Sequence, residues 1–184
     1  MRIVGGKFRG RSLAPPKSQA IRPTTDRNRE SLFNILNHAH GDLLDGARVL
    51  DIFAGTGALG LEALSRGASH CTFMEISAEG RGILRQNVET LGLTGVTKIL
   101  RRDATRPGQA GALGPFNLVF ADPPYGKGFG EKALTALRTH RWLAGEALVL
   151  LEEAKGRLPA ALEGFEQVDH RAMGDTEIGF YRTQ

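Results

Sequence analysis

The sequence predicts an α/β domain whose mostly parallel sheet is covered by helices on both faces. From residue 47 onward, short apolar runs typical of strands alternate regularly with segments typical of helices. The first of these strands ends in a glycine-rich turn that leads directly into a helix, and the length of 184 residues suits one such domain. Because right-handed crossovers keep parallel strands in one direction, we expect their carboxyl ends to form a single ligand-binding edge.

Residues 1–24 are expected to form a basic β-hairpin arm and linker ahead of the main domain, which covers residues 25–184. Two short extended runs, residues 3–8 and 11–13, flank Arg9-Gly10, and Pro15-Pro16 opens the linker. Residues 1–29 carry eight Lys or Arg and only one acid, so their net charge is +7, whereas the rest of the chain sums to −3. Arg predominates, and glycines and Phe8 lie between the charges, which favours nucleic acid contact over a passive solvated tail.

The main domain is expected to open with a helix and to continue as alternating strands and helices. Thr25 is the expected N-cap of the first helix, and the stripe of Leu32, Phe33, Ile35, Leu36 and Ala39 should pack against the sheet. The predicted strands cover residues 47–53, 70–75, 96–101, 116–121 and 146–152, and the predicted helices cover 58–66, 78–91 and about 129–139. The tail is expected to close as a hairpin of residues 165–170 and 178–182.

The composition excludes several classes of protein. Its hydrophobic content of 41% and charged content of 24% are ordinary for a soluble globular protein. No apolar run approaches the roughly 18 residues that span a bilayer, and residues 1–7 lack a signal-type apolar segment, so we expect a cytoplasmic protein without membrane contact. Cys71 is the only cysteine, and the five histidines lack metal-ligand spacing, so neither an intrachain disulfide nor a bound metal is expected.

The glycine-rich turn is expected to bind a nucleoside-containing cofactor. Gly55-x-Gly57-x-x-Gly60 satisfies the dinucleotide fingerprint, and Glu75 follows at the distance of a ribose-binding acid. Asp51, four residues before the first glycine, changes the interpretation: Asp-x-x-x-Gly-x-Gly resembles the first motif of methyltransferases that use S-adenosylmethionine, a sulfonium amino acid that needs a nearby acid. We therefore favour S-adenosylmethionine over a nicotinamide cofactor, and over a turn that binds nothing.

Three acids, Asp51, Glu75 and Asp103, fall at or just after the ends of successive predicted strands. Glu75 can accept both ribose hydroxyls, and Asp103 with the backbone N–H of Ala104 can contact adenine. Each acid alone is equally compatible with capping the element that follows it, but three in register favour a pocket. The expected cofactor-binding residues are Asp51, Phe53, Ala54, Gly55, Gly57, Glu75, Asp103, Ala104 and Asp122.

Asp122-Pro123-Pro124-Tyr125, directly after the strand at 116–121, is the most specific motif of the chain. Two prolines make the loop stiff, because neither residue fits a helix or a central strand. The Asp122 carboxylate and the Pro123 carbonyl can each accept one hydrogen of a nucleobase amine, which aims its lone pair, and Tyr125 can stack on the base. Asp122 can also accept the released proton. These three residues are the expected catalytic group, with a mere turn as the alternative.

The chain resembles the amino-directed nucleic acid methyltransferases that carry an Asn/Asp-Pro-Pro-Tyr/Phe motif. Residues 2–11, 22–27 and 29–34 narrow this resemblance to the RsmD family of bacterial methyltransferases that modify the guanine 2-amino group in small-subunit (16S) ribosomal RNA. Residues 51–68 and 122–125 extend it nearly end to end. Asn28 departs from the apolar residue expected there. The resemblance implies a Rossmann-like methyltransferase fold, a mostly parallel seven-stranded sheet with an antiparallel last strand.

The resemblance also implies direct methyl transfer without a metal, on 16S ribosomal RNA within the small subunit. A single compact domain with an arm that holds the substrate can work as a monomer. The residues expected to contact RNA are Lys7, Arg9, Arg11, Arg22, Thr24 and Arg27, of which the last three can also reach the active site. Two alternatives remain open: an adenine methyltransferase acting on DNA or RNA, which only the arm argues against, and a nucleic acid-binding module with a vestigial cofactor fold.

Overall fold

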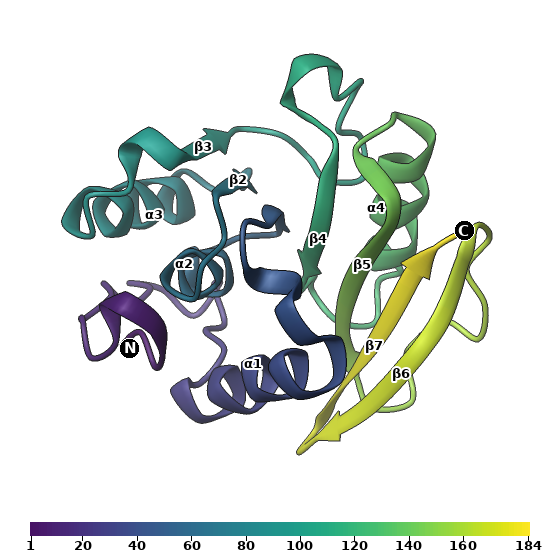
Figure 1. Ribbon diagram of the computed structural model, residues 1–184, viewed down its shortest axis with the longest axis horizontal. Helices are drawn as coiled ribbons and strands as arrows, with labels where there is room; N and C mark the ends of the chain where they lie inside the picture. The colour runs from purple at the N-terminus through teal and green to yellow at the C-terminus, as the bar shows by residue number, and fades with distance from the viewer.

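One mixed sheet forms the centre of the computed structural model, which describes residues 1–184 (Figure 1). Its strands are β1 (Arg48–Ile52), β2 (His70–Met74), β3 (Thr97–Leu100), β4 (Phe116–Ala121), β5 (Leu143–Ala154), β6 (Phe165–Met173) and β7 (Thr176–Thr183). They lie in the order β3-β2-β1-β4-β5-β7-β6, and β7 alone runs opposite to the other six strands. The prediction of a mostly parallel seven-stranded sheet with an antiparallel last strand is confirmed.

Helices cover both faces of the sheet. They are α1 (Asp26–His40), α2 (Ala58–Ser65), α3 (Ala78–Thr90) and α4 (Phe129–Thr139). Apolar residues of α1, α2 and α3 share one core with alternate residues of the central strands, such as Val49 and Leu118. The other residues of those strands, such as Leu50 and Val119, form a second core with α4. Strands buried on both faces explain the continuous apolar runs of the sequence.

The ends of the elements differ from the predictions mainly at the tail. The predicted helices and the strand at 116–121 match within a residue or two, whereas β5 begins at Leu143 and extends to Ala154. The closing hairpin is also longer than expected, because pairing continues to Met173 and Thr176 at its turn. Ala39, placed in the apolar stripe of α1, is exposed. None of the helices combines the length and the apolar character that crossing a membrane requires.

The N-terminal β-hairpin is reduced to a single antiparallel bridge between Arg2 and Ser12. Residues Gly6–Phe8 form a short 3-10 turn instead of the second half of a strand. Hydrogen bonds to Ser65 of α2 replace strand pairing there: its hydroxyl accepts from Phe8 N at 3.0 Å and donates to Gly5 O at 2.6 Å. Gly6 has φ +76°, and a Cβ atom at this position would lie 2.0 Å from Ser65 O, so only glycine permits this contact.

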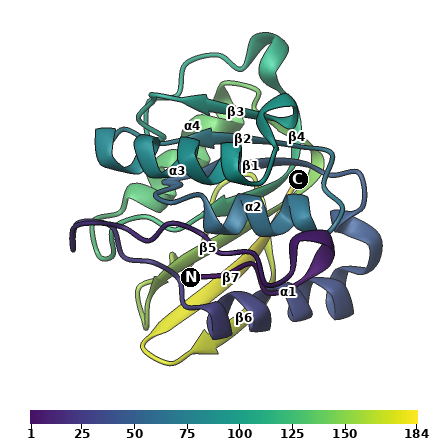
Figure 2. The same cartoon turned by 90° about the vertical axis from the view of Figure 1, so that its left-hand side faces the viewer.

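The N-terminal segment, residues 1–20, packs against the helices that cover the sheet (Figure 2). Ile3 and Leu13 are buried in the same core as α1 and α2. Further along, Ala14 N donates to Asn87 Oδ1 at 2.7 Å, on α3. The division of the chain at residue 24 stays a prediction, and it does not coincide with a gap in the packing.

Arg29 of α1 joins this segment to the main domain. Its fully buried guanidinium donates to the Arg2 carbonyl and to the Thr24 carbonyl, the latter at 3.1 Å. Its Nε lies 3.9 Å from the buried Glu62 carboxylate of α2, which also accepts from Val4 N. Removing one partner from such a buried ion pair is costly. Arg29 therefore fixes the N-terminal residues, the segment at Thr24 and α2 relative to one another.

Candidate active site

A cavity of about 640 Å³ opens at the carboxyl ends of the parallel strands. Its walls come from the turns after β1, β2, β3 and β4, from the end of β5, from residues 20–25, and from the β6–β7 turn. Eight of the nine predicted cofactor residues line it, Asp122 among them, together with Tyr125. The remaining cofactor residue is Gly57. The cavity therefore brings the two predicted motifs together at one site.

Hydrogen bonds to the end of β2 fix the glycine-rich turn after β1. Gly55 N donates to Glu75 Oε1 at 3.1 Å, and Ala54 N donates to Met74 O at 3.0 Å. Phe53, Ala54 and Gly55 line the cavity, but Gly57 does not. Gly57 has φ +81°, and a Cβ atom there would lie 2.1 Å from Leu84 Cδ1. The structure thus explains this glycine by helix packing rather than by contact with the cavity.

Asp51 is almost completely buried at the floor of the cavity. Its Oδ2 accepts from Gly60 N, the first turn of α2, at 3.0 Å. Burial raises the pKa of Asp51 well above its usual range, and the nearby acids Asp122 and Glu75 raise it further. Burial likewise raises the pKa of Glu75. No cation is among the groups that shift the pKa of Asp51, which suits a ligand that brings positive charge, as S-adenosylmethionine does.

Asp103 lies in the same cavity but in a different environment. Its Oδ1 accepts from Thr105 Oγ1 at 2.7 Å and from Thr105 N at 2.9 Å. These hydrogen bonds lower the pKa of Asp103. The alternative of a local cap is therefore realised, although Asp103 and the buried Ala104 still line the cavity. One carboxylate oxygen, Oδ2, keeps only a distant ion pair, at 3.8 Å from Arg106 Nε.

The Asp-Pro-Pro-Tyr loop lies on the opposite wall, after β4. Burial and the charge of Glu152 raise the pKa of Asp122 to about 8. Tyr125 OH donates to Glu152 Oε1 at 2.7 Å, and burial followed by the charges of Asp122 and Glu152 raises the Tyr125 pKa, so the hydroxyl stays a donor. Gly126 N donates to Glu153 Oε1 at 2.8 Å, which fixes the far end of the loop.

Residues 20–25 bring the end of the N-terminal segment into the site. Thr24 Oγ1 lies 3.5 Å from Asp122 Oδ2, and the Arg22 guanidinium lies 5.4 Å from the centre of the Tyr125 ring. Both residues line the cavity, as expected, whereas Arg27 does not. Arg22 covers one face of the tyrosine, so a base stacking on Tyr125 needs the other face or a displaced Arg22.

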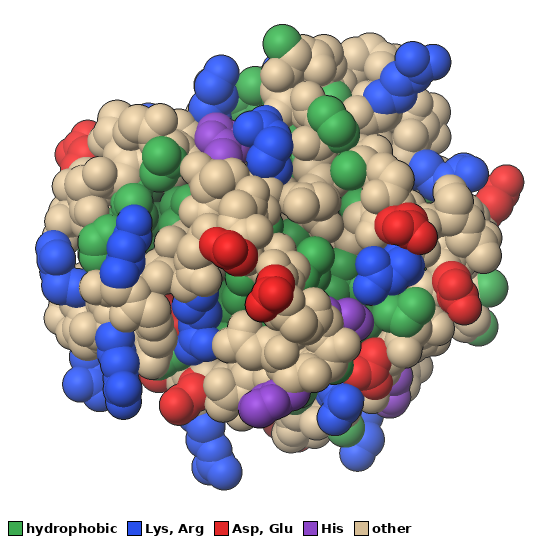
Figure 3. Space-filling view, in the orientation of Figure 1, with side chains coloured by type: hydrophobic (Ala, Val, Ile, Leu, Met, Phe, Trp, Pro, Cys, Tyr) green, Lys and Arg blue, Asp and Glu red, His purple; other side chains and the backbone are tan.

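Lys7, Arg9 and Arg11 lie on the exposed surface, away from the cavity. Figure 3 shows Lys and Arg side chains along the side of the molecule where the N-terminal segment and α3 lie. The Arg11 guanidinium donates to the carbonyl of Thr90 at the end of α3, at 3.0 Å. Arg9 forms no ion pair and no side-chain hydrogen bond, so it is the freer of the two charges.

Sequence reasoning missed several residues of the cavity, above all Glu152. The rule that selected Asp51, Glu75 and Asp103 also applies to Glu152, because it follows the central apolar run of β5. Asn28 and residues 173–176 also line the cavity. No sequence signal identifies the β6–β7 turn as part of the site, because only the antiparallel return of β7 carries it there.

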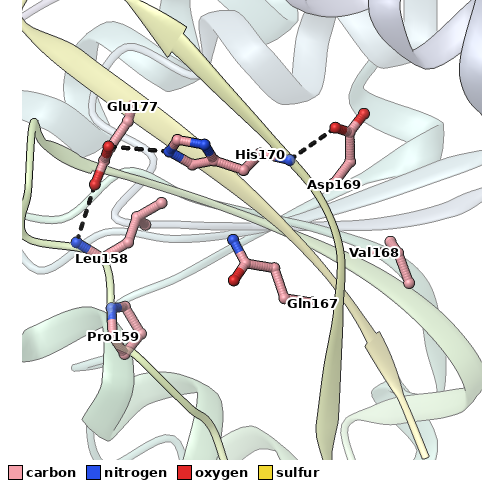
Figure 4. A pocket seen from close by; sticks show the side chains of 7 residues that line it. All are labelled: Leu158, Pro159, Gln167, Val168, Asp169, His170 and Glu177. Atoms are coloured by element: carbon pink, nitrogen blue, oxygen red, sulfur yellow. Dashed lines mark hydrogen bonds and ion pairs between the residues drawn. The ribbon is translucent and has the colours of Figure 1, made fainter.

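A second hollow lies at the outer edge of the sheet, on β6 (Figure 4). Its residues include Pro159, Gln167 and Asp169, and His170 Nε2 lies 3.0 Å from Glu177 Oε2. It contains none of the predicted site residues and is separate from the cavity between the two motifs.

Comparisons with known proteins agree along the whole chain. A family model described as conserved hypothetical protein 95 matches residues 1–182. Ribosomal RNA small subunit methyltransferase D of Escherichia coli K12 is 37% identical, over 100% of this chain and 90% of that protein. The protein of the same name from Haemophilus influenzae is 32% identical, over 99% and 93%. A solved Escherichia coli methyltransferase structure has a TM-score of 0.84 at 35% identity, covering 100% of this chain and 98% of its own.

Proposed function

The chain belongs to the RsmD family of ribosomal RNA small subunit methyltransferases, and from this we propose that it methylates the 2-amino group of a guanine in 16S ribosomal RNA, with S-adenosylmethionine as the donor. The product is 2-methylguanosine. The observation that carries the proposal is the single cavity in which the acids of the first motif face Asp122 and Tyr125. An adenine methyltransferase is not favoured by the comparisons.

We assign the cofactor to the half of the cavity formed by the turns after β1, β2 and β3. Asp51 would oppose the positive charge of the amino acid part, and the Glu75 carboxylate would accept from ribose. Asp103 and Ala104 would contact the adenine, and Phe53, Ala54 and Gly55 would border it. When bound, S-adenosylmethionine supplies an electrophilic methyl group. Gly57 supports this half by allowing Leu84 of α3 to pack closely against the turn.

Asp122, Pro123 and Tyr125 would orient the guanine. The 2-amino lone pair is delocalised into the ring, so the amine is a poor nucleophile until its hydrogens are fixed. The Asp122 carboxylate and the Pro123 carbonyl accept those hydrogens and direct the lone pair at the methyl group. As the new N–C bond forms, the amine becomes more acidic, and ionised Asp122 can take the proton. The stiffness of the double proline keeps these acceptors in place.

The basic residues would hold the RNA. Lys7, Arg9 and Arg11 supply positive charge at the surface, and Arg27 lies on the exposed start of α1. Arg22 and Thr24 lie at the mouth of the reaction site, so they would contact the target nucleotide or its phosphate. We propose that the protein acts as a monomer in the cytoplasm on RNA within the small subunit.

The decisive experiment supplies radiolabelled S-adenosylmethionine and small subunits that lack this methyl group, followed by nucleoside mass spectrometry. The proposal expects 2-methylguanosine in 16S RNA. Labelled methyladenosine would overturn the guanine assignment while keeping the reaction class. No label in any nucleic acid would instead support a binding module.

A further inference from the structure

Glu152, which lines the cavity beside Asp122, is an acid that the proposed mechanism leaves without a task. Tyr125 OH donates to its Oε1, and no protein group donates to its Oε2. Because Oε2 is not one of the buried atoms that lack a partner, it is accessible, and Glu152 lines the cavity. A carboxylate oxygen that lacks a partner at a ligand cavity is available to accept a hydrogen bond from the ligand.

The position of Glu152 matches that of Asp122 on the neighbouring strand. β4 and β5 pair in parallel with Ala121 opposite Leu151, and both of these residues pack in the core beneath α4. The residue that follows Ala121 is Asp122, and the residue that follows Leu151 is Glu152. Since neighbouring strands lie about 4.8 Å apart, the two carboxylates can face adjacent groups of one base.

Two neighbouring acids are costly unless a ligand donates to both. The charge of Glu152 helps to raise the pKa of Asp122, and the only cation that counteracts it there is Arg22. Guanine carries two adjacent donors on one edge, N1–H and the 2-amino group. Adenine carries a donor, its 6-amino group, beside the N1 lone pair, which a carboxylate repels.

We propose that Glu152 is the residue that selects guanine, by accepting the N1–H of the base whose 2-amino hydrogens are held by Asp122 and Pro123. This inference rests on the proposed function. Tyr125 OH keeps the Glu152 carboxylate in position, so the tyrosine that stacks on the base also orients the acid that recognises it. A polar site built for a donor rejects an analogue that lacks this donor, because its buried acceptor stays unpaired.

The test uses small subunits reconstituted with 16S RNA that carries 2,6-diaminopurine at the methylated position. This base keeps the 2-amino group but replaces N1–H with a lone pair. The wild-type protein should methylate guanine about 100-fold more efficiently than the analogue, measured as kcat/KM. In Glu152→Gln the ratio should fall to about tenfold or less, because the amide can turn its N–H toward the lone pair.

Three further variants separate recognition from structural support. Glu153→Gln changes the neighbouring acid, which bonds Gly126 N outside the cavity, and should keep the wild-type ratio. Tyr125→Phe removes the donor to Glu152 and should lower both rates while guanine stays preferred. Glu152→Asp keeps a carboxylate and should keep the preference for guanine. It provides a second test in case Glu152→Gln folds poorly.

An unchanged ratio in Glu152→Gln would overturn the inference. If both rates also fell in Glu152→Gln, as expected for Tyr125→Phe, that unchanged ratio would show that Glu152 only supports the tyrosine. A wild-type protein that methylates no guanine at all would contradict the proposed function itself, and mass spectrometry of the unmodified substrate distinguishes that failure from an unchanged ratio.

Discussion

The two halves of the cavity are built in different ways. In the half formed by the turns after β1, β2 and β3, each acid accepts from a backbone N–H close in the chain: Asp51 from Gly60, 9 residues away, Glu75 from Gly55, 20 away, and Asp103 from Thr105, 2 away. In the half formed after β4 and β5, Thr24 contacts Asp122 over 98 residues, and Tyr125 contacts Glu152 over 27.

This difference separates binding from chemistry. The contacts of the first half lie within one turn or between the turns of neighbouring strands, which suits a ligand common to many enzymes. The second half depends on segments from three parts of the chain, which suits a site specific to one substrate. Substitutions in the two halves should therefore affect different measurements.

Asp122→Ala should have the largest effect and should act on the reaction alone. Transfer should fall by about 1,000-fold or more, because one variant removes both an orienting acceptor and the proton acceptor. Cofactor affinity, measured by isothermal titration calorimetry, should change little. Strong residual turnover would remove Asp122 from the mechanism, and a large loss of cofactor affinity would break the separation between the halves.

Asp51→Asn should act on binding. The amide oxygen can keep the hydrogen bond from Gly60 N while the charge is lost, so the fold should be retained. Cofactor affinity should fall by about 10- to 100-fold, in line with the loss of a charge-assisted interaction, and transfer at saturating cofactor should recover most of the wild-type rate. A rate that stays low at saturation would place Asp51 in the reaction half.

Asp122 and Asp103 should change stability with pH in opposite directions. The native pKa of Asp122 is about 8, above its usual 3.8, so the native state keeps a proton that the unfolded chain releases, and stability falls as pH rises from about 4 to about 8. Asp122→Asn removes this loss. Its Tm should exceed that of the wild type by a few degrees at pH 8, with the difference vanishing near pH 4.

Asp103→Asn is the matched variant in the other half. Hydrogen bonds lower the pKa of Asp103, so its contribution to stability is present above the unfolded pKa and is lost as pH falls through the lower folded value. This variant should be less stable than the wild type at pH 8 and equal to it in strong acid. Parallel pH profiles for the two variants would contradict the contrast between their environments.

Arg9 and Arg11 should give the smallest effects and should separate surface charge from docking. Arg9→Ala should weaken RNA binding a few-fold and reduce the slope of log affinity against log salt by about 1, with unchanged Tm. Arg11→Ala should also lower Tm, because its guanidinium is bonded to the Thr90 carbonyl. An unchanged salt slope in Arg9→Ala would argue against the RNA contact.

The sequence predicts the parts of this molecule that depend on local order. Strand and helix alternation and the Thr25 cap are visible in runs of a few residues, and the structure confirms them. The acids at the strand ends are visible in the same way, and they line the cavity. The N-terminal β-hairpin is shorter than predicted: backbone hydrogen bonds such as Ile3 N to Arg11 O flank one bridge, and Ser65 bonds the segment between the two runs. Glu152 and the buried Arg29 could not be assigned roles, because their partners become neighbours only in the folded chain.

The docking of the N-terminal segment has a consequence for synthesis. Val4 and Ala14 bond to Glu62 and Asn87, which follow them by 58 and 73 residues. At roughly 5–20 residues per second, the ribosome takes several seconds to deliver these partners after the segment has been made. The most basic part of the chain is thus translated before its partners, and it completes its folding only after α2 and α3 have been made.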